Sequence, residues 1–501
     1  MFELTQAFLF FLTAQISSIV FSFGRAKALA AFTGVAGLGV ISQGTNLIAI
    51  SQIIFGGGLT TGFVNLIAKY SKEDNPQKLN QVISSIFYFG TILGILGVIC
   101  AGIFSKQISI SVFGDPRYSG FVLICTVSAC FVFQYLFFQN LFRGLLEWKV
   151  YSLTYIAGYV ANLIMTVALI IIFNINGAMW ALLASQVGNL LIAIFVYQRV
   201  IKARHSISFI TVKPTLEIIR LLFAIVAPLL IIQVLGSLSN LVISSLIIKQ
   251  LGVDQNGIYR VASGISDGYM GLILAFQYSY VLPKIAGTIK KEPQAARKTQ
   301  NDGLRMGLFV ITPMLIALFA FREIWIPILY SRAFLAAKDI VGLKFLCDFF
   351  LVIRISLNID LVPTNRLKFY ILDGLLFAGG MIIFTAAFLP SLHLTAVVAG
   401  GLVINVLLVL LSFGYHLKRT TLRVSPENQL LFIKALFMLG SGFVASVLIN
   451  NLLIRGFVIA AVLVLIPVIL PKKGELASLL QEIKSALNKT KQVVEVSHLT
   501  D

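Results

Sequence analysis

Charged residues are scarce in this sequence. They occupy only 12% of the 501 positions, whereas apolar residues occupy 58%. Soluble globular domains carry about 25% charged residues, so this composition excludes an ordinary soluble protein. Apolar runs of about 20 residues, the length that spans a bilayer core, recur along the chain. The runs are continuous rather than alternating, which argues against a transmembrane β-barrel. The sequence therefore predicts an all-α polytopic membrane protein.

Potential metal ligands and catalytic motifs are equally sparse. There are four cysteines and four histidines. The cysteines fall inside apolar runs, where they are expected to be small buried side chains, and the histidines show no metal-ligand spacing. The sequence contains no G-x-x-x-x-G-K-[ST] loop, no H-E-x-x-H and no G-x-S-x-G. We therefore expect no cofactor, no metal and no catalytic residue, and we predict neither an enzyme nor a nucleotide-driven pump.

About 14 apolar segments are predicted to be transmembrane helices. They lie near 7–30, 36–69, 79–104, 118–142, 150–173, 177–198, 217–248, 253–285, 303–321, 339–361, 367–389, 392–416, 430–450 and 453–470. The loops after even-numbered segments, counted together with the adjoining ends of the segments, contain 21 Lys and Arg residues, against seven in the other loops. By the positive-inside rule this bias predicts cytoplasmic N- and C-termini. Much of the net charge of +19 then reflects topology rather than nucleic-acid binding.

A repeated glycine motif divides the chain. "GVAGLG" begins at Gly34 and "GVDQNG" at Gly252, so the offset is 252 − 34 = 218. We predict two parallel six-helix repeats, 1–205 and 206–420, around a central cleft. A further transmembrane hairpin is predicted at 428–470 and a cytoplasmic amphipathic tail at 471–501. The hairpin is expected either to cover one side of the bundle or to offer a docking face for a glycan polymerase or chain-length regulator.

Several charged residues interrupt the apolar segments. A charge at the bilayer centre costs about 3 kcal/mol or more, so it normally faces the bundle interior or water. Arg260 and Asp267 share one helix face but lie about 10 Å apart along the axis, which we expect to be too far for a direct ion pair. Lys344 and Asp348 are four residues apart and can pair. That pair is either a structural salt bridge or part of a functional site.

The basic residues of these segments predict an anion site facing the cleft. Its candidates are Arg260, Arg25, Arg354 and Lys344, and the candidates for coupling transport to an ion gradient are Asp267 and Asp348. Arg25 and Lys27 point about 200° apart around one helix, so only one of them is expected to face the cleft. Lys27 is expected to extend toward the outer membrane interface.

Four stretches together resemble the Wzx-type flippases. They are "FTGVAGLGVISQ", "GFVNLIAKYSKEDNPQKL", "GIYRVASGISDGYMGLILAFQYSYVLPKI" and "RLKFYILDG". These flippases belong to the multidrug/oligosaccharidyl-lipid/polysaccharide exporter superfamily, which also contains multidrug and toxin exporters and the peptidoglycan lipid II flippase. The resemblance covers about residues 5–420 and is strongest to the O-antigen and enterobacterial common antigen branch.

This resemblance implies a location, a substrate and a site. It implies a bacterial inner-membrane protein, surrounded by membrane lipids, that moves an undecaprenyl-pyrophosphate-linked oligosaccharide from the cytoplasmic to the periplasmic leaflet. It also implies a V-shaped cavity, in which Arg25 and Arg260 look similar to the basic residues of the lipid II branch. The second-span arginine of that branch has no evident match here, which weakens the interpretation of this chain as a lipid II flippase.

Two other functions stay open at this stage. A cation-coupled multidrug exporter would prefer an acidic cleft, whereas Arg and Lys predominate here. A membrane enzyme, such as a sugar polymerase, would need a sizeable external loop with catalytic acids. The longest such loop, "FREIWIPILYSRAFLAAKD", is short and basic.

Overall fold

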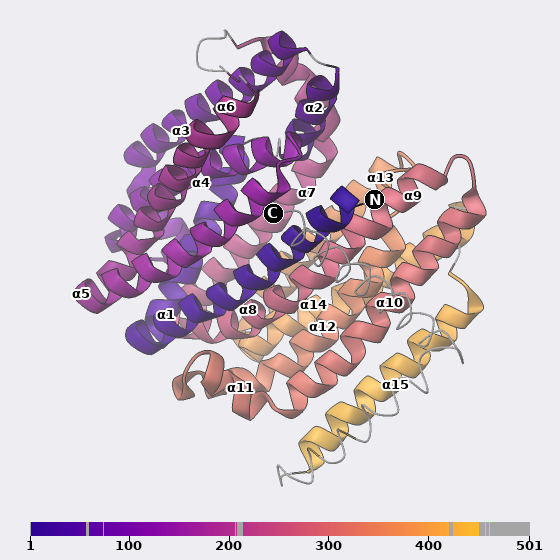
Figure 1. Ribbon diagram of the computed structural model, residues 1–501. Coiled ribbons are helices and arrows are strands. Elements are labelled where there is room, and N and C mark those ends of the chain that lie inside the picture. Colours follow the sequence, from indigo (N-terminus) through magenta and orange to yellow (C-terminus); the bar gives the residue numbers. More distant parts are fainter. Residues whose placement is uncertain are drawn as a thin grey trace, which may run out of the picture.

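The computed structural model describes residues 2–56, 60–73, 75–205, 207, 214–419, 424–449, 456 and 460. Within these ranges the regular elements are all helical, which confirms the predicted all-α fold (Figure 1). The predicted segments up to 430–450 fall on these helices. The last segment, 453–470, and the tail, 471–501, lie outside the described residues apart from two isolated positions.

The helices follow the predicted order. The first half, as we name it, contains α1 (Phe2–Gly56), α2 (Thr60–Lys72), α3 (Pro76–Phe113), α4 (Ser119–Gly144), α5 (Trp148–Val196) and α6 (Lys202–His205). The second half contains α7 (Leu216–Leu251), α8 (Val253–Phe276), α9 (Leu282–Thr288), α10 (Pro293–Ala320), α11 (Arg322–Leu329), α12 (Lys338–Asn358), α13 (Leu367–Leu392) and α14 (Leu394–Arg419). The helix α15 (Pro426–Leu448) follows.

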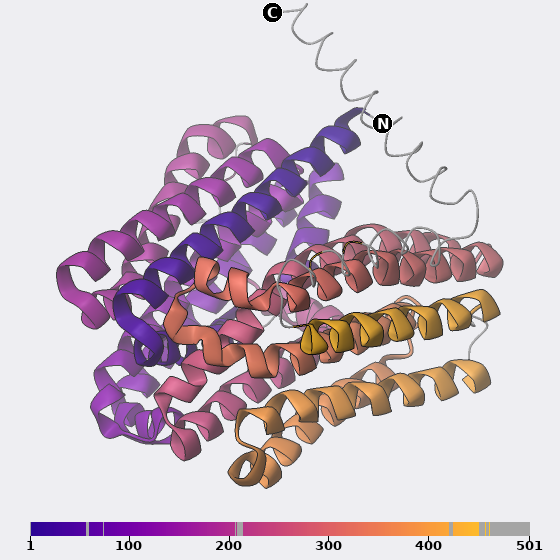
Figure 2. The same cartoon turned by 90° about the horizontal axis from the view of Figure 1, so that it is seen from below.

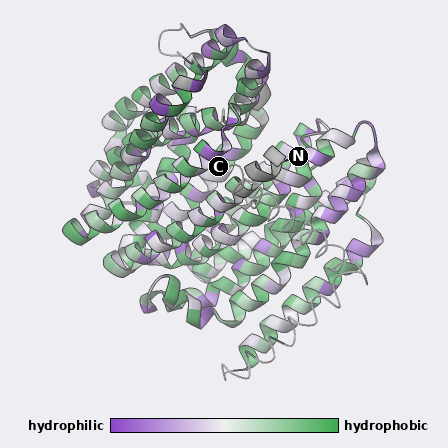
Figure 3. Cartoon of the chain, in the orientation of Figure 1, coloured by the Kyte–Doolittle hydropathy of each residue, from purple (hydrophilic) through white to green (hydrophobic). Residues whose placement is uncertain are grey.

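Nine helices of the described part are long and apolar enough to cross a membrane. Two of them, α1 and α5, contain two predicted segments each. The helices α8 and α12 are not among the nine, because they carry the charges discussed below. Large apolar side chains such as Ile103, Ile383 and Phe437 point outward and are 66%, 71% and 75% exposed. Figure 3 shows this apolar character over the outer helices, as expected of a surface in contact with lipid.

Both long helices, α1 and α5, fold back on themselves at a single residue. The turn in α1 lies at Gly34 (φ 67°) and the turn in α5 at Asn174 (φ 51°). In α5 a Cβ added to Gly177 would lie 1.9 Å from the carbonyl oxygen of Leu169. In an unbroken helix eight residues span about 12 Å. The chain therefore reverses at Asn174, and two antiparallel helices are joined almost without a loop.

The second half has turns of the same kind at related positions. Gly252 (φ 95°) joins α7 to α8, and His393 (φ 49°) joins α13 to α14. The offset between Gly34 and Gly252 is 252 − 34 = 218, and the offset between Asn174 and His393 is 393 − 174 = 219. These paired turns support the predicted duplication. The boundaries 1–205 and 206–420 remain a prediction.

The repeated glycine motif is where the two halves touch. A Cβ added to Gly39 would lie 2.0 Å from the carbonyl oxygen of Val253, and one added to Gly257 would lie 2.2 Å from that of Val35. Both glycines and both valines obey the offset of the repeat, since 257 − 39 = 253 − 35 = 218. The contact is therefore reciprocal. The motif of α1 presents a carbonyl to the glycine of α8, and the motif of α8 presents a carbonyl to the glycine of α1. Only glycine permits backbones to approach this closely.

Further polar contacts tie the halves together at this end. Asn256 Nδ2 on α8 donates to the carbonyl oxygen of Gly39 (2.8 Å) and to Ser42 Oγ (3.1 Å). Lys27 Nζ donates to the carbonyl oxygen of Pro327 on α11 (2.8 Å), so this side chain is fixed by the opposite half rather than extending freely to the interface. In Figures 1 and 2 the ribbons of the two halves meet near these elements, and in Figure 1 they spread apart toward α2 and α9.

The helix α15 lies on the outside of the second half. Phe443 of α15 stacks on Phe319 of α10, with ring centroids 4.1 Å apart. At its start Asn428 Nδ2 donates to the carbonyl oxygen of Asn301 (2.8 Å). The helix thus covers α10, as one of the two predicted roles of the hairpin requires. That the hairpin also docks a partner protein remains a prediction.

The reciprocal glycine contact gives a stability prediction. Gly39→Ala and Gly257→Ala should each lower the thermal unfolding midpoint in detergent, because the new methyl group pushes a backbone carbonyl away. Gly102→Ala is the matched control, since a Cβ at that position of α3 meets nothing within 4 Å in the described part of the chain. The Gly102→Ala variant should have an unchanged or slightly higher thermal unfolding midpoint. Equal midpoints for all three variants would contradict the close contact.

Candidate functional site

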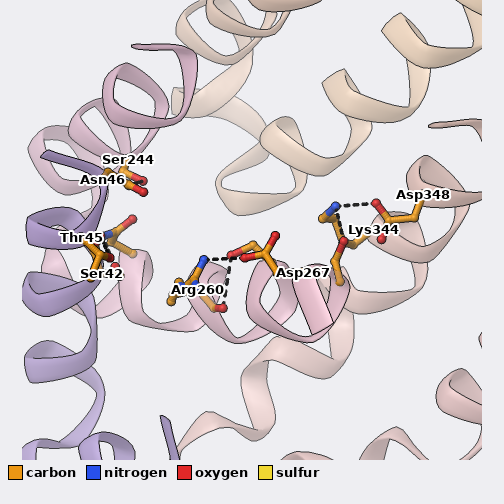
Figure 4. A network of polar contacts seen from close by, with 11 residues as sticks. Ser42, Thr45, Asn46, Ser244, Arg260, Asp267, Lys344 and Asp348 are labelled. Carbon is orange, nitrogen blue, oxygen red and sulfur yellow. Dashed lines mark hydrogen bonds and ion pairs between the residues drawn. The ribbon is translucent and has the colours of Figure 1, made fainter. Parts of the chain in front are cut away.

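The two charged residues of α8 form a direct ion pair. Arg260 Nη1 lies 2.9 Å from Asp267 Oδ2 (Figure 4). The expectation that seven residues would keep them apart is wrong. The long arginine side chain runs along the helix surface, while the Cβ of Asp267 leans back toward it. Gly264 lies between them and leaves the path open: a Cβ there would be 3.9 Å from Arg260 Nε.

This pair stays accessible although it is surrounded by other elements. The Arg260 and Asp267 side chains are 40% and 65% exposed. The helix α8 packs against α1, α7 and α12, and the Tyr330 hydroxyl would lie 2.7 Å from a Cβ at Gly264. Tyr330 itself is only 2% exposed and comes from the segment after α11. The pair is therefore exposed although other elements pack around α8, and that it faces a wet interior remains a prediction.

Arg25 brings a second positive charge to the same region from the first half. Its guanidinium lies close to the like charge of Arg260 and to the hydroxyl group of Tyr159. Its Nε atom is buried and finds no hydrogen-bond acceptor among the described residues. Asp267, by contrast, lies at ion-pair distance from Arg260. Two arginines from opposite halves thus lie near each other, but only Arg260 is paired with a carboxylate, which leaves a net positive charge.

Lys344 and Asp348 form a closed network instead. Lys344 Nζ lies 2.6 Å from Asp348 Oδ1 and donates to Ser266 Oγ on α8 (2.9 Å). The other carboxylate oxygen accepts a hydrogen bond from Tyr269 of α8. Asp348 is fully buried and the Lys344 side chain is 17% exposed. Of the two readings left open by the sequence, this geometry favours a structural salt bridge within α12, whose hydrogen bonds to Ser266 and Tyr269 link it to α8.

Arg354 is also neutralised within the second half. Its Nε lies 3.7 Å from Asp373 Oδ2 on α13, and its guanidinium lies 4.3 Å from the centre of the Phe377 ring. Both charged side chains are 10% exposed. Arg354 follows Lys344 by ten residues, about 15 Å along α12. The four predicted basic residues therefore do not form one cluster: Arg25 and Arg260 approach each other, whereas Lys344 and Arg354 have carboxylate partners of their own.

A polar strip beside this region was not singled out from the sequence as part of the site. Asn46 Nδ2 of α1 donates to Ser244 Oγ of α7 (3.1 Å), and Gln43 Nε2 donates to Ser245 Oγ (2.8 Å). In Figure 4 Asn46 and Ser244 lie across from Arg260. Tyr330 was missed as well. These residues come from distant elements, so no local spacing links them to Arg260.

Comparison with known proteins places this arrangement in a family context. A family model described as "Polysaccharide biosynthesis protein" matches residues 7–339. The chain is 26% identical over 355 residues to the lipid III flippases of Escherichia coli (strain K12) and Shigella flexneri, covering 69% of this chain and 82% of each relative.

Solved structures share the fold at lower identity. The lipid II flippase MurJ in an inward closed conformation gives a TM-score of 0.70 at 17% identity, covering 92% of this chain and 98% of that one. A multidrug resistance MATE family transporter in an inward-facing conformation gives 0.63 at 15% identity, covering 79% and 93%. The expected resemblance is thereby confirmed at the level of the family, and the solved structures confirm the expected fold.

The two carboxylates should differ sharply in their effect on stability. Asp348→Asn leaves Lys344 as a buried charge without a counter-ion, which should lower the free energy of unfolding by about 3–5 kcal/mol. Asp267→Asn breaks an exposed pair and should cost about 1 kcal/mol or less. Thermal or denaturant unfolding in detergent measures both. Similar losses for the two variants would refute the distinction between a structural pair and an accessible one.

Proposed function

Because the chain belongs to the polysaccharide biosynthesis protein family, we propose that it is a flippase for a lipid-linked oligosaccharide. Its substrate is an undecaprenyl-pyrophosphate-linked glycan of the O-antigen or enterobacterial common antigen type. The protein moves it from the cytoplasmic to the periplasmic leaflet of a bacterial inner membrane. The lipid III flippases, 26% identical to this chain, support this reading.

The observation that carries the proposal is the pair of arginines from opposite halves. Arg25 and Arg260 are close enough to repel each other, and Asp267 compensates only one of them. A pyrophosphate is a compact multiple anion, and guanidinium groups bind phosphate oxygens through paired hydrogen bonds. A pyrophosphate bound by both arginines would relieve their mutual repulsion and link the two halves. A cationic drug would instead be disfavoured at this position, which argues against the multidrug alternative.

Binding requires the pyrophosphate to compete with Asp267. Both anions seek the Arg260 guanidinium, and the pyrophosphate carries more charge. Its arrival releases the Asp267 carboxylate, which is then free to take up a proton or a cation. In this proposal Asp267 couples the ion gradient to substrate binding, whereas Lys344, Asp348 and Arg354 hold the second half together. The step involves no bond chemistry in the substrate.

Alternating access then requires the contact between the halves to open. With the N-terminus in the cytoplasm, the glycine contact and the Lys27–Pro327 hydrogen bond close the periplasmic end. The substrate enters from the cytoplasmic side. Rocking of the halves separates Gly39 from Val253 and Gly257 from Val35 while a new contact forms at the other end. The lipid tail remains in the membrane throughout.

Transport of a labelled lipid-linked oligosaccharide in proteoliposomes tests the function. Arg260→Ala should abolish transport without loss of folded protein, and Arg260→Lys should retain part of it, because an ammonium loses the two-pronged fit to phosphate. Arg117→Ala is the matched control, since it also breaks an arginine–aspartate pair, with Asp115, but in an exposed turn. Full transport by Arg260→Ala would overturn the anion site.

Asp267→Asn should separate binding from coupling. The variant should bind the lipid-linked substrate at least as tightly as the wild type, because its carboxylate no longer competes for Arg260. Its transport rate should no longer respond to an imposed ion gradient. Rates in liposomes with and without a proton or sodium gradient measure the response, with Asp115→Asn as the control. An undiminished response to the gradient would rule out the coupling role.

A further inference from the structure

Four tyrosines gather on α4 and α5 inside the first half. Tyr151, Tyr155 and Tyr159 recur every four residues and so share one face of α5. Their ring centroids are 5.6 Å and 5.0 Å apart in sequence order, and the hydroxyl oxygens of Tyr155 and Tyr159 are 3.4 Å apart. Tyr135 of α4 brings its hydroxyl near those of Tyr151 and Tyr159. Phenylalanine would serve a purely apolar contact, so the clustered hydroxyls point to a polar ligand.

Two buried carboxamides beside the tyrosines have unused hydrogen-bonding capacity. Gln139 is 2% exposed and its carboxamide lies within hydrogen-bonding reach of the Tyr135 hydroxyl, but it finds no other partner for its Oε1 or Nε2 among the described residues. Asn189 of α5 is 3% exposed, and in the same part of the chain its Oδ1 has no partner. Burying such groups unpaired is unfavourable. They are therefore best explained by a ligand that supplies the missing donors and acceptors.

A glycine lets two of these groups approach the backbone of α5. A Cβ added to Gly158 would lie 3.0 Å from Asn189 Oδ1 and 3.0 Å from the Tyr135 hydroxyl oxygen. The two polar atoms therefore converge over the bare backbone of α5, from two different helices. The first half thus combines stacked aromatic faces with convergent polar atoms, the combination typical of small-molecule binding surfaces.

This face is continuous with the anion site. Tyr159, at one end of the row, lies near Arg25, which in turn is close to Arg260. At the other end Arg143 lies 5.8 Å from the centre of the Tyr151 ring, and Trp148 packs edge-on against Tyr151. From Trp148 to Tyr159 the row extends about 16 Å along α5. A ligand held at Arg25 can therefore extend along the tyrosines.

We propose that this face binds the sugar units of the transported lipid. Sugar rings present apolar C–H faces that stack on aromatic rings, and hydroxyl groups that donate to and accept from carboxamides. With the pyrophosphate between Arg25 and Arg260, the first sugar lies beside Tyr159 and later sugars follow toward Trp148. The inference rests on the proposed flippase function and adds to it a subsite that reads the glycan rather than the phosphate.

Two lipids that share the pyrophosphate distinguish this subsite from the anion site. One is the full lipid-linked glycan extracted from native cells, and the other is undecaprenyl pyrophosphate bearing a single sugar. In proteoliposomes the Gln139→Leu variant should transport the full lipid-linked glycan about tenfold more slowly than the wild type, since the substitution removes two hydrogen-bonding atoms. It should leave the single-sugar lipid within about twofold of wild type. The thermal midpoint should stay equal or rise, because leucine buries no unpaired amide.

Tyr155→Phe tests a single hydroxyl in the same way, with a smaller loss for the full glycan. Its matched control is Tyr280→Phe, a tyrosine of the second half that stacks on Phe276 at 5.6 Å, as Tyr155 does on Tyr151. Equal slowing of both lipids, or no slowing of either, would overturn the sugar subsite and leave the flippase intact. A wild-type protein that moves neither lipid would overturn the proposed function, and the subsite with it.

Discussion

Two backbone carbonyls packed against two glycines determine how the halves of this protein meet. Because the carbonyl of Val253 fills the space over Gly39, and that of Val35 the space over Gly257, α1 and α8 approach to backbone contact. That approach brings Arg260, one turn beyond Gly257, opposite the helix that carries Arg25. The same glycines that give the sequence its repeat thus also set the distance between the two charges of the proposed site.

The intramembrane charges fall into two physical classes. Lys344 with Asp348, within α12, and Arg354 with Asp373, between α12 and α13, are largely buried beside their counter-ions inside one half. Arg25 and Arg260 come from different halves and are only partly compensated. A burial penalty is tolerable in the first class because the partner is fixed in the same rigid unit. In the second class it is tolerable because the Arg260–Asp267 pair is exposed.

The sequence was sufficient for the helices but only partly for the site. Hydrophobic runs predicted the helix order, since bilayer thickness fixes their length, and the motif beginning at Gly34 and Gly252 marked two turns of the same kind. Single-residue turns at Asn174 and His393 left no such signal. The Arg260–Asp267 pair was missed because axial spacing ignores side-chain reach. Tyr330 and Ser244 could not be linked to Arg260 by spacing, since only the tertiary fold brings them near it.

The exposed pair on α8 also bears on what the protein ignores. Cells contain abundant chloride, free carboxylates and other small anions, any of which could occupy an uncovered arginine. Asp267 is tethered to the same helix as Arg260 and is therefore always present at high local concentration. A singly charged anion from solution attracts Arg260 no more strongly than the Asp267 carboxylate does. Asp267 therefore acts as an intramolecular competitive inhibitor of anion binding at Arg260. Only an anion of higher charge, held by further contacts, displaces Asp267.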